Sequence, residues 1–259
     1  MHVMELGRGP AVMIIHGSPA PIADLLPLAE RLAVAHHVLI PELPGFGRTP
    51  PDTEISSDRI CDGIAAILRA RGHSAPRAII GFSSGGYRAL DLALRRNITP
   101  ELVVGLAALA TLEDADRAMF RAFAASIRAD PSCAQIRPML PGRWLSDAWR
   151  RAHPEDDARV TAWIDLTTPQ HLAAELEAQA NMLDLRPLLP SLGCPLYLRV
   201  GELDLACPPP VSVEMARLAP RATVDVVPGC GHALLVENAA ATIQRVVDVV
   251  TNAGLLLGR

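Results

Sequence analysis

The chain has 259 residues, half of them hydrophobic and a fifth charged, so its composition is globular and excludes an intrinsically disordered protein. This length suits one large α/β domain and requires no second independent core. The formal net charge is −4 and the arginines are scattered, so no basic surface is expected for a phosphate backbone and nucleic acid is not an expected partner.

The first half of the chain alternates between short apolar runs and longer helical patterns. Four strands are predicted, over residues 11–15, 37–40, 77–80 and 102–106. Three helices are predicted between and after them, over residues 22–33, 56–71 and 84–96. These strands are apolar on both faces, as parallel strands covered by helices must be. The alternation therefore predicts βαβ units and a mostly parallel sheet flanked by helices.

The pattern changes in the middle of the chain, where residues 113–190 contain helical segments and turns but no strand-like run. Alternation then returns, with strands predicted over 196–200 and 223–227 and helices over 211–218 and 236–251. We interpret residues 1–112 and 191–259 as one α/β core. Residues 113–190 are interpreted as a helical cap, or lid, inserted between strands over the carboxyl edge of the sheet.

Membrane insertion and metal binding are not expected. The N-terminus resembles no signal peptide, no run reaches the ~18 apolar residues of a spanning helix, and the apolar end Gly254 to Leu257 is expected to be only the tail of the last helix. The five cysteines lack the spacing of a zinc site or redox motif, and Cys230 near His232 has no further ligands beside it. A cytoplasmic protein with free thiols, no metal and no cofactor is expected.

A nucleophile elbow is predicted around Ser83. The segment from Gly81 to Gly86 follows an apolar strand and precedes a helix, and it reads Gly-Phe-Ser-Ser-Gly-Gly. Such a tight strand-to-helix turn needs small residues two before and two after the serine, and Gly81 and Gly85 meet that demand. Ser84 is the rival nucleophile, but Phe82 would then occupy a position that needs a small side chain. Ser83 is therefore the predicted nucleophile.

A serine hydroxyl needs a base, and the base needs an acid that orients it. Among eight histidines, His232 is favoured because it lies in a Gly-rich loop after a predicted strand and before the last helix, at the same sheet edge as Ser83. Asp204 and Glu202 follow the strand ending at residue 200, whereas Asp225 lies within a strand. Asp204 is preferred because it lies deeper in the loop. The chain order Ser, Asp, His is that of α/β-hydrolases.

An oxyanion hole is predicted from two backbone N–H groups. One is that of Ser84, directly after the nucleophile, and the other is that of Ser18, in the loop His16-Gly17-Ser18-Pro19 after the first core strand. Gly17 permits a close approach and Pro19 has no N–H to offer. The alternative interpretation of His16-Gly17 is an ordinary strand-ending turn.

With these motifs in order, together with the segments Pro41 to Gly47, Gly201 to Asp204 and Gly231-His232, the chain resembles the α/β-hydrolase fold family over nearly its whole length. The resemblance implies that the loop containing Phe46 lies at the mouth of the pocket and that the insert forms a helical lid that selects substrates. One departure is visible, because only about ten residues precede the first core strand, so the usual leading hairpin must be shortened.

Within the family, the insert resembles that of 3-oxoadipate enol-lactonases, through the segments Arg143-Trp144-Leu145, Ala148 to Pro154 and Asp184 to Pro187. This resemblance implies a small enol-lactone substrate whose carboxylate is bound by an arginine of the insert, for which Arg143 is the candidate. A solvated helix-end arginine is the alternative. The substrate-binding candidates are His16, Gly17, Phe46, Phe82, Arg143, Trp144 and Trp163, although packing of the insert explains its aromatic residues equally well.

The leading hypothesis is hydrolysis of a small carboxylic ester or lactone through an acyl-serine intermediate, by a monomer or homodimer. Carbon-carbon bond hydrolysis, thioester hydrolysis and peroxidase-like side reactions use the same triad, and a slow-turnover ligand-sensing protein would also retain it. Haloalkane dehalogenases and epoxide hydrolases of this fold are excluded, since they carry an aspartate at the position of Ser83.

Overall fold

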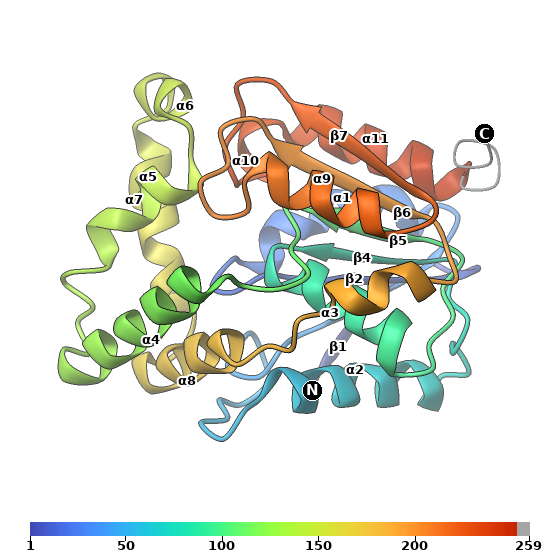
Figure 1. Cartoon of the computed structure of the whole chain (residues 1–259), viewed down its shortest axis with the longest axis horizontal. Helices are drawn as coiled ribbons and strands as arrows, with labels where there is room; N and C mark the ends of the chain where they lie inside the picture. Colours follow the sequence, from blue (N-terminus) through green and yellow to red (C-terminus); the bar gives the residue numbers. More distant parts are fainter. Residues whose placement is uncertain (253–259) are drawn as a thin grey trace.

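The computed structural model of the protein describes residues 1–252, and it contains a seven-stranded sheet between helical layers (Figure 1). The strand order is β1-β3-β2-β4-β5-β6-β7, and every pair is parallel except β1 with β3. The strands are β1 (Val3–Leu6), β2 (Ala11–Ile15), β3 (His37–Pro41), β4 (Ala78–Phe82), β5 (Val103–Leu106), β6 (Leu196–Gly201) and β7 (Ala222–Val227).

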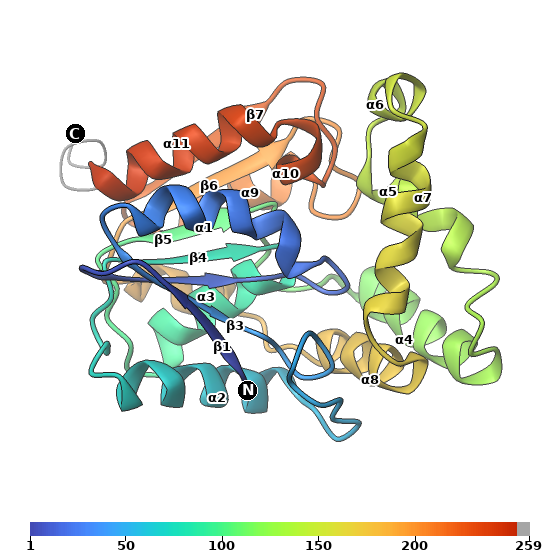
Figure 2. The same ribbon diagram turned by 180° about the vertical axis from the view of Figure 1, so that it is seen from behind.

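Two layers of helices cover the sheet, as the both-face apolar strands predicted (Figures 1 and 2). One layer consists of α1 (Leu26–Ala33), α10 (Leu234–Glu237) and α11 (Ala239–Thr251), and the other of α2 (Ser57–Ala70), α3 (Ser84–Arg95) and α9 (Pro209–Leu218). Alternate residues of each strand serve the two layers: in β2, Val12 and Ile14 pack toward α1, whereas Met13 and Ile15 pack toward α2 and α3.

The chain between β5 and β6 is helical, and most of it lies beyond the carboxyl ends of the parallel strands, as both views show (Figures 1 and 2). Its helices are α4 (Asp114–Ala129), α5 (Leu140–Trp144), α6 (Asp147–Ala152), α7 (Glu155–Ala162) and α8 (Pro169–Ala180), with 3-10 turns η2 (Arg137–Met139), η3 (Trp163–Leu166) and η4 (Arg186–Ser191). Helices α4 and α8 pack against each other, whereas η4 packs back against α3 and α9. The segment therefore reaches over the sheet edge where Ser83 lies.

The predicted α/β-hydrolase fold is confirmed, with differences at element ends. Strand β1 was not predicted; it is an edge strand that pairs antiparallel with β3, and it is the one strand before β2. The first predicted helix begins as a 3-10 turn, η1 (Ile22–Leu25), and the last is interrupted at Asn238. Residues 253–259, including the apolar stretch Gly254 to Leu257, lie outside the described residues.

Within residues 1–252, no helix combines the length and apolar character that crossing a membrane would require. Across the same residues, no three or more His, Cys, Asp or Glu side chains converge as a metal site would require. All five cysteines are buried as free thiols, and burial raises the pKa of Cys61, Cys194, Cys207 and Cys230 well above that of an ordinary thiol.

Candidate active site

Ser83 occupies the turn between β4 and α3 in a backbone conformation with φ 53° and ψ −122°. This positive φ is uncommon for a residue other than glycine. The neighbouring backbone leaves no space for side chains: a Cβ on Gly81 would lie 2.1 Å from the Gly85 carbonyl oxygen, and one on Gly85 would lie 2.3 Å from the Ile15 oxygen. The small residues at these two positions are therefore a steric requirement of the turn, as the sequence predicted.

The side chains of His232 and Asp204 form a buried pair, with His232 Nδ1 2.8 Å from Asp204 Oδ2. The other carboxylate oxygen, Oδ1, accepts the backbone N–H groups of Ala206 and Cys207, both at 2.8 Å. Asp204 is thus held by its own loop in an orientation that serves the imidazole. His232 Nε2 is buried and has no hydrogen-bond partner among the described residues, so it remains available to a nucleophile.

The two other acid candidates are occupied elsewhere. The exposed Glu202 accepts the N–H of Gly229 at 2.8 Å through Oε2, on the outer side of the histidine loop. Asp225 pairs with Arg199 and accepts a hydrogen bond from the Tyr197 hydroxyl at 2.6 Å. It lies in β7, which β5 and β6 separate from the strand that leads to Ser83. The geometry thus brings Asp204, rather than Glu202 or Asp225, to His232.

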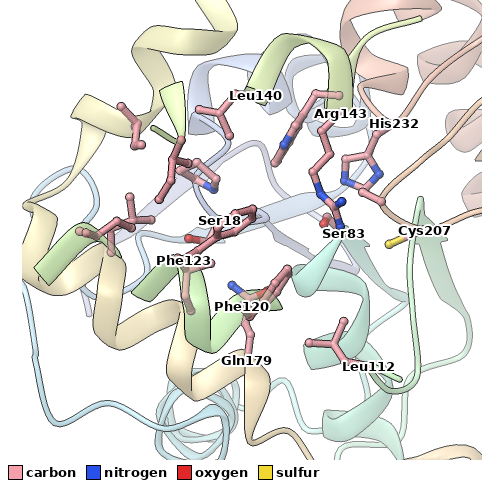
Figure 3. Close-up of a pocket in the computed structure, with 18 of the residues that line it drawn as sticks. Ser18, Ser83, Leu112, Phe120, Phe123, Leu140, Arg143, Gln179, Cys207 and His232 are labelled. Atoms are coloured by element: carbon pink, nitrogen blue, oxygen red, sulfur yellow. The ribbon is translucent and has the colours of Figure 1, made fainter. Parts of the chain in front are cut away.

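Ser83 and His232 line the same cavity, which has a volume of about 80 Å³. Figure 3 shows Ser83, Arg143 and His232 grouped together, with Phe120 and Phe123 across the cavity from them. Much of the remaining wall is apolar and comes from α4 and α8, including Ile127, Leu172 and Leu176. The cavity is therefore apolar with a few polar groups at one end, as small-molecule sites commonly are.

Among the described residues that line this cavity, Arg143 is the only arginine, and no lysine lines it. Within residues 1–252 its side chain has no hydrogen bond or ion pair, whereas most other arginines of the same helical segment, such as Arg128 and Arg150, pair with carboxylates. A half-buried, unpaired guanidinium that faces a cavity is suited to bind a ligand carboxylate.

The predicted oxyanion loop has a contact that sequence reasoning missed. The Ser18 N–H points at Ser84 Oγ, at 3.3 Å, and the same oxygen accepts Nη1 of Arg88 at 3.0 Å. Because 3.3 Å is long for an N–H···O bond, the Ser18 N–H is only weakly engaged. Gly17 lies against the elbow, since a Cβ there would be 3.0 Å from both Phe82 O and Ser83 Cβ. The loop is thus packed directly on the turn that carries Ser83.

The Arg88 side chain, 1% exposed, continues this contact into a buried polar network. Its Nη2 donates to Glu175 Oε1 of α8, which also accepts Nε2 of Gln179 at 3.3 Å. Gln179 lines the cavity, so the network joins the pocket wall of α8 to the helix that follows Ser83. The i, i+4 spacing of Ser84 and Arg88 was the only hint of it in the sequence.

Of the remaining substrate-binding candidates, Trp144 lines the cavity and the others do not. His16, Phe82 and Trp163 line a separate cavity of about 10 Å³, and Phe46 is buried between His16 and His171, with ring centroids 4.9 and 6.2 Å away. They therefore support the site by packing. Phe120 and Phe123, which the sequence did not single out from the other aromatic residues, supply its walls.

Burial lowers the pKa of His16 from 6.5 to about 4. The ring contacts the Gly17 carbonyl at 2.8 Å through Nδ1, and Nε2 accepts the Leu43 N–H at 3.2 Å. One donor and one acceptor are what a neutral imidazole offers. His16 therefore links the loop of residues 16–19 to the loop after β3 in its uncharged form.

This environment predicts an acid-sensitive stability. Below pH 6.5 the unfolded chain binds a proton at His16 that the folded chain excludes, so the free energy of unfolding should fall as the pH drops from about 6.5 to about 4, by about 3 kcal/mol from this group. Urea unfolding of the wild type and of His16→Asn across this range measures the effect. The difference between the two curves should shrink toward pH 4, and parallel curves would contradict the assignment.

Known proteins resemble this chain in sequence. The sequence model of the alpha/beta hydrolase family matches residues 12–245. A magnesium-chelatase 30 kDa subunit from Rhodobacter capsulatus is 29% identical, and the match covers 90% of this chain and 83% of that protein. A pimeloyl-[acyl-carrier protein] methyl ester esterase from Xanthomonas oryzae pv. oryzae is 28% identical, with 96% of this chain and 100% of that protein covered.

Solved structures resemble it in fold. A thermophilic esterase from Thermogutta terrifontis superposes with a TM-score of 0.87 at 24% identity, covering 96% of this chain and 92% of that one. An enol-lactonase from Burkholderia xenovorans LB400 superposes with a TM-score of 0.85 at 21% identity, covering 96% of each chain. The family match spans strands β2 to β7, the turn at Ser83 and the loop of His232, and the fold agrees with it, so this chain belongs to the α/β-hydrolase family.

Proposed function

We propose that the protein hydrolyses a small carboxylic ester or lactone, with Ser83 as nucleophile, His232 as general base and Asp204 as the orienting acid. One observation carries the proposal: Ser83 and the hydrogen-bonded His232–Asp204 pair come from three distant parts of the chain and meet at one end of an apolar cavity. The esterases among the relatives support hydrolysis of an ester bond.

The first half of the reaction forms an acyl-enzyme. Ser83 Oγ attacks the substrate carbonyl while His232 Nε2, which has no hydrogen-bond partner within residues 1–252, takes the hydroxyl proton. The Asp204 carboxylate stabilises the resulting imidazolium through Nδ1. The N–H of Ser84, at the start of α3, and the weakly engaged N–H of Ser18 are the donors for the oxyanion. His232 then protonates the departing alcohol oxygen as the ester bond breaks.

The second half releases the acid. A water molecule enters beside His232, which removes its proton as the water oxygen attacks the acyl carbon. The acyl bond to Ser83 breaks, and the proton returns to Ser83 Oγ. In a lactone the alcohol and acid remain parts of one molecule, so the product is a single hydroxy acid, or a keto acid when the lactone is an enol-lactone.

The cavity favours a small substrate that carries a carboxylate. Its volume of about 80 Å³ has room for only a small organic group, since a single water occupies at least ~10–15 Å³ measured in this way. The apolar wall from α4 and α8 suits a hydrocarbon portion, and the unpaired Arg143 guanidinium beside Ser83 suits an anionic group near the scissile bond (Figure 3).

The test is steady-state hydrolysis of short p-nitrophenyl esters, simple lactones and an enol-lactone, with wild-type protein and folded Ser83→Ala. Turnover of at least ~1 per second on the best substrate is expected, and it should vanish in the variant. Half the substrates should carry a carboxylate and half its uncharged methyl ester. Arg143→Met should raise KM for the acids about 10-fold or more and leave the uncharged compounds nearly unchanged.

Three results would contradict these assignments. If Ser83→Ala retains the wild-type rate, the nucleophile assignment is wrong. If folded wild-type protein hydrolyses nothing beyond a single stoichiometric turnover, a ligand-sensing role replaces the enzyme. If Arg143→Met affects acids and their methyl esters equally, the arginine does not bind a substrate carboxylate.

A further inference from the structure

The backbone on both sides of His232 is tied to the segment that carries Arg143. The N–H of Gly231, the residue before the histidine, donates to Glu237 Oε1 at 3.1 Å. The N–H of Ala233, the residue after it, donates to the carbonyl of Trp144 at 2.9 Å. The histidine loop is therefore attached on both sides of His232, through Glu237 on one side and directly to the turn after α5 on the other.

One carboxylate provides one side of this attachment. Glu237 of α10 accepts the N–H of Ser146 at 3.0 Å through Oε1 and the Ser146 hydroxyl at 2.6 Å through Oε2. Ser146 in turn caps α6, since its Oγ accepts the N–H of Trp149 at 3.2 Å. Glu237 thus joins three donors, two from the turn after α5 and one, Gly231 N–H, from the histidine loop.

The contact is close and surrounds the imidazole. A Cβ on Gly231 would lie 2.6 Å from Glu237 Oε1 and 2.8 Å from the Ser146 nitrogen, so no side chain fits there. The Trp144 ring packs edge-on against the His232 ring, with centroids 4.8 Å apart. Because Arg143 directly precedes Trp144, the attachment also fixes the backbone position from which the Arg143 side chain extends.

We propose that Glu237 is a positioning residue that sets His232 and Arg143 in register with each other and with Ser83. This rests on the proposed function of His232. Asp204 fixes the rotation of the His232 ring through the hydrogen bond at Nδ1. Glu237 instead fixes the position of the backbone loop that carries His232. A shift of the base by about 1 Å costs on the order of 100-fold in rate. Loss of the Glu237 carboxylate should therefore lower kcat, because the loop that carries His232 is then free to shift.

The chain contains a matched control. Glu202 also accepts a backbone N–H of the same loop, that of Gly229 at 2.8 Å, but it is exposed and has no bond to the turn after α5. Glu237→Gln and Glu202→Gln therefore remove the same charge and weaken one loop contact each. Only the first weakens the link to Ser146.

The experiment measures kcat and KM of both variants on the best uncharged ester and the best acid from the substrate panel. Glu237→Gln should lower kcat about 10- to 100-fold on both, with KM for the uncharged ester within threefold. Its KM for the acid should rise further, because Arg143 loses its register. Glu202→Gln should stay within twofold of wild type. Hydrogen exchange should accelerate in peptides covering 143–149 and 229–233 in Glu237→Gln alone.

The outcomes separate this inference from the proposed function. Equal kcat values for Glu237→Gln and Glu202→Gln, or loss of kcat in both, would overturn the positioning role, because loop stability alone would then explain the data. If wild-type protein hydrolyses no substrate, or Ser83→Ala matches it, the proposed function fails. The exchange comparison still tests the link in that case, and unchanged exchange in Glu237→Gln overturns it.

Discussion

His232→Ala is expected to lower kcat by about 10⁶-fold while the protein stays folded, because Ser83 then has no base and the imidazolium cannot form. Asp204→Ala should cost less, about 10⁴-fold, since the imidazole remains but loses the acceptor that sets its tautomer. Steady-state rates on the best substrate, with circular dichroism as the check on folding, measure both.

The proposed triad should act as a unit, and this expectation supplies an internal control. Ser83→Ala combined with His232→Ala should be no slower than either single variant, because once one partner is lost the others contribute nothing further. Additive losses in the double variant would contradict a shared mechanism. Full activity in folded Asp204→Ala would show that Asp204 does not orient the base.

Glu175→Ala is expected to reduce the free energy of unfolding by about 3–5 kcal/mol, the largest stability effect we anticipate. It leaves the Arg88 guanidinium buried and without its counter-ion, and the cost of an unpaired buried charge exceeds that of an ordinary cavity. Urea or guanidinium unfolding gives the value. Hydrolysis should fall as well, because Arg88 also holds Ser84 Oγ and through it the loop that contains Ser18, a proposed oxyanion donor.

Two further variants identify the cause. Glu177→Ala lies on the same helix and breaks the solvent-exposed pair with Arg128, so it should cost under ~1 kcal/mol. Arg88→Met with Glu175→Leu removes both charges and should be markedly more stable than Glu175→Ala alone. If the double variant is as unstable as the single one, packing of α8 rather than the unpaired charge explains the loss.

Much of the fold was predictable because its signals are local. Six of the seven strands were predicted within two residues. Five of them, β2 to β6, are buried almost throughout and mainly apolar, as strands covered on both faces must be. The edge strand β7, in which only Val227 is buried, was predicted from the return of the strand and helix alternation. Strand β1 was missed because an edge strand of four residues, three of them half-buried and one exposed, carries no continuous apolar run. The break at Asn238 was missed because helix ends depend on local backbone geometry rather than periodicity.

The elbow could be recognised from the sequence without any tertiary contact. Gly81 and Gly85 stand where a side chain would collide with backbone, and that constraint lies within a few residues of Ser83. The order of Ser83, Asp204 and His232 was equally visible, because parallel strands deliver the loops at their carboxyl ends to one edge of the sheet.

The side chains that surround this edge became known only from the packing of distant segments. The walls from Phe120 and Phe123, the buried Arg88–Glu175 pair and the Glu237 attachment join segments up to 91 residues apart. Contacts between distant segments depend on how the helices of residues 114–180 pack over the sheet, and side-chain packing of this kind leaves no periodic signal in the chain.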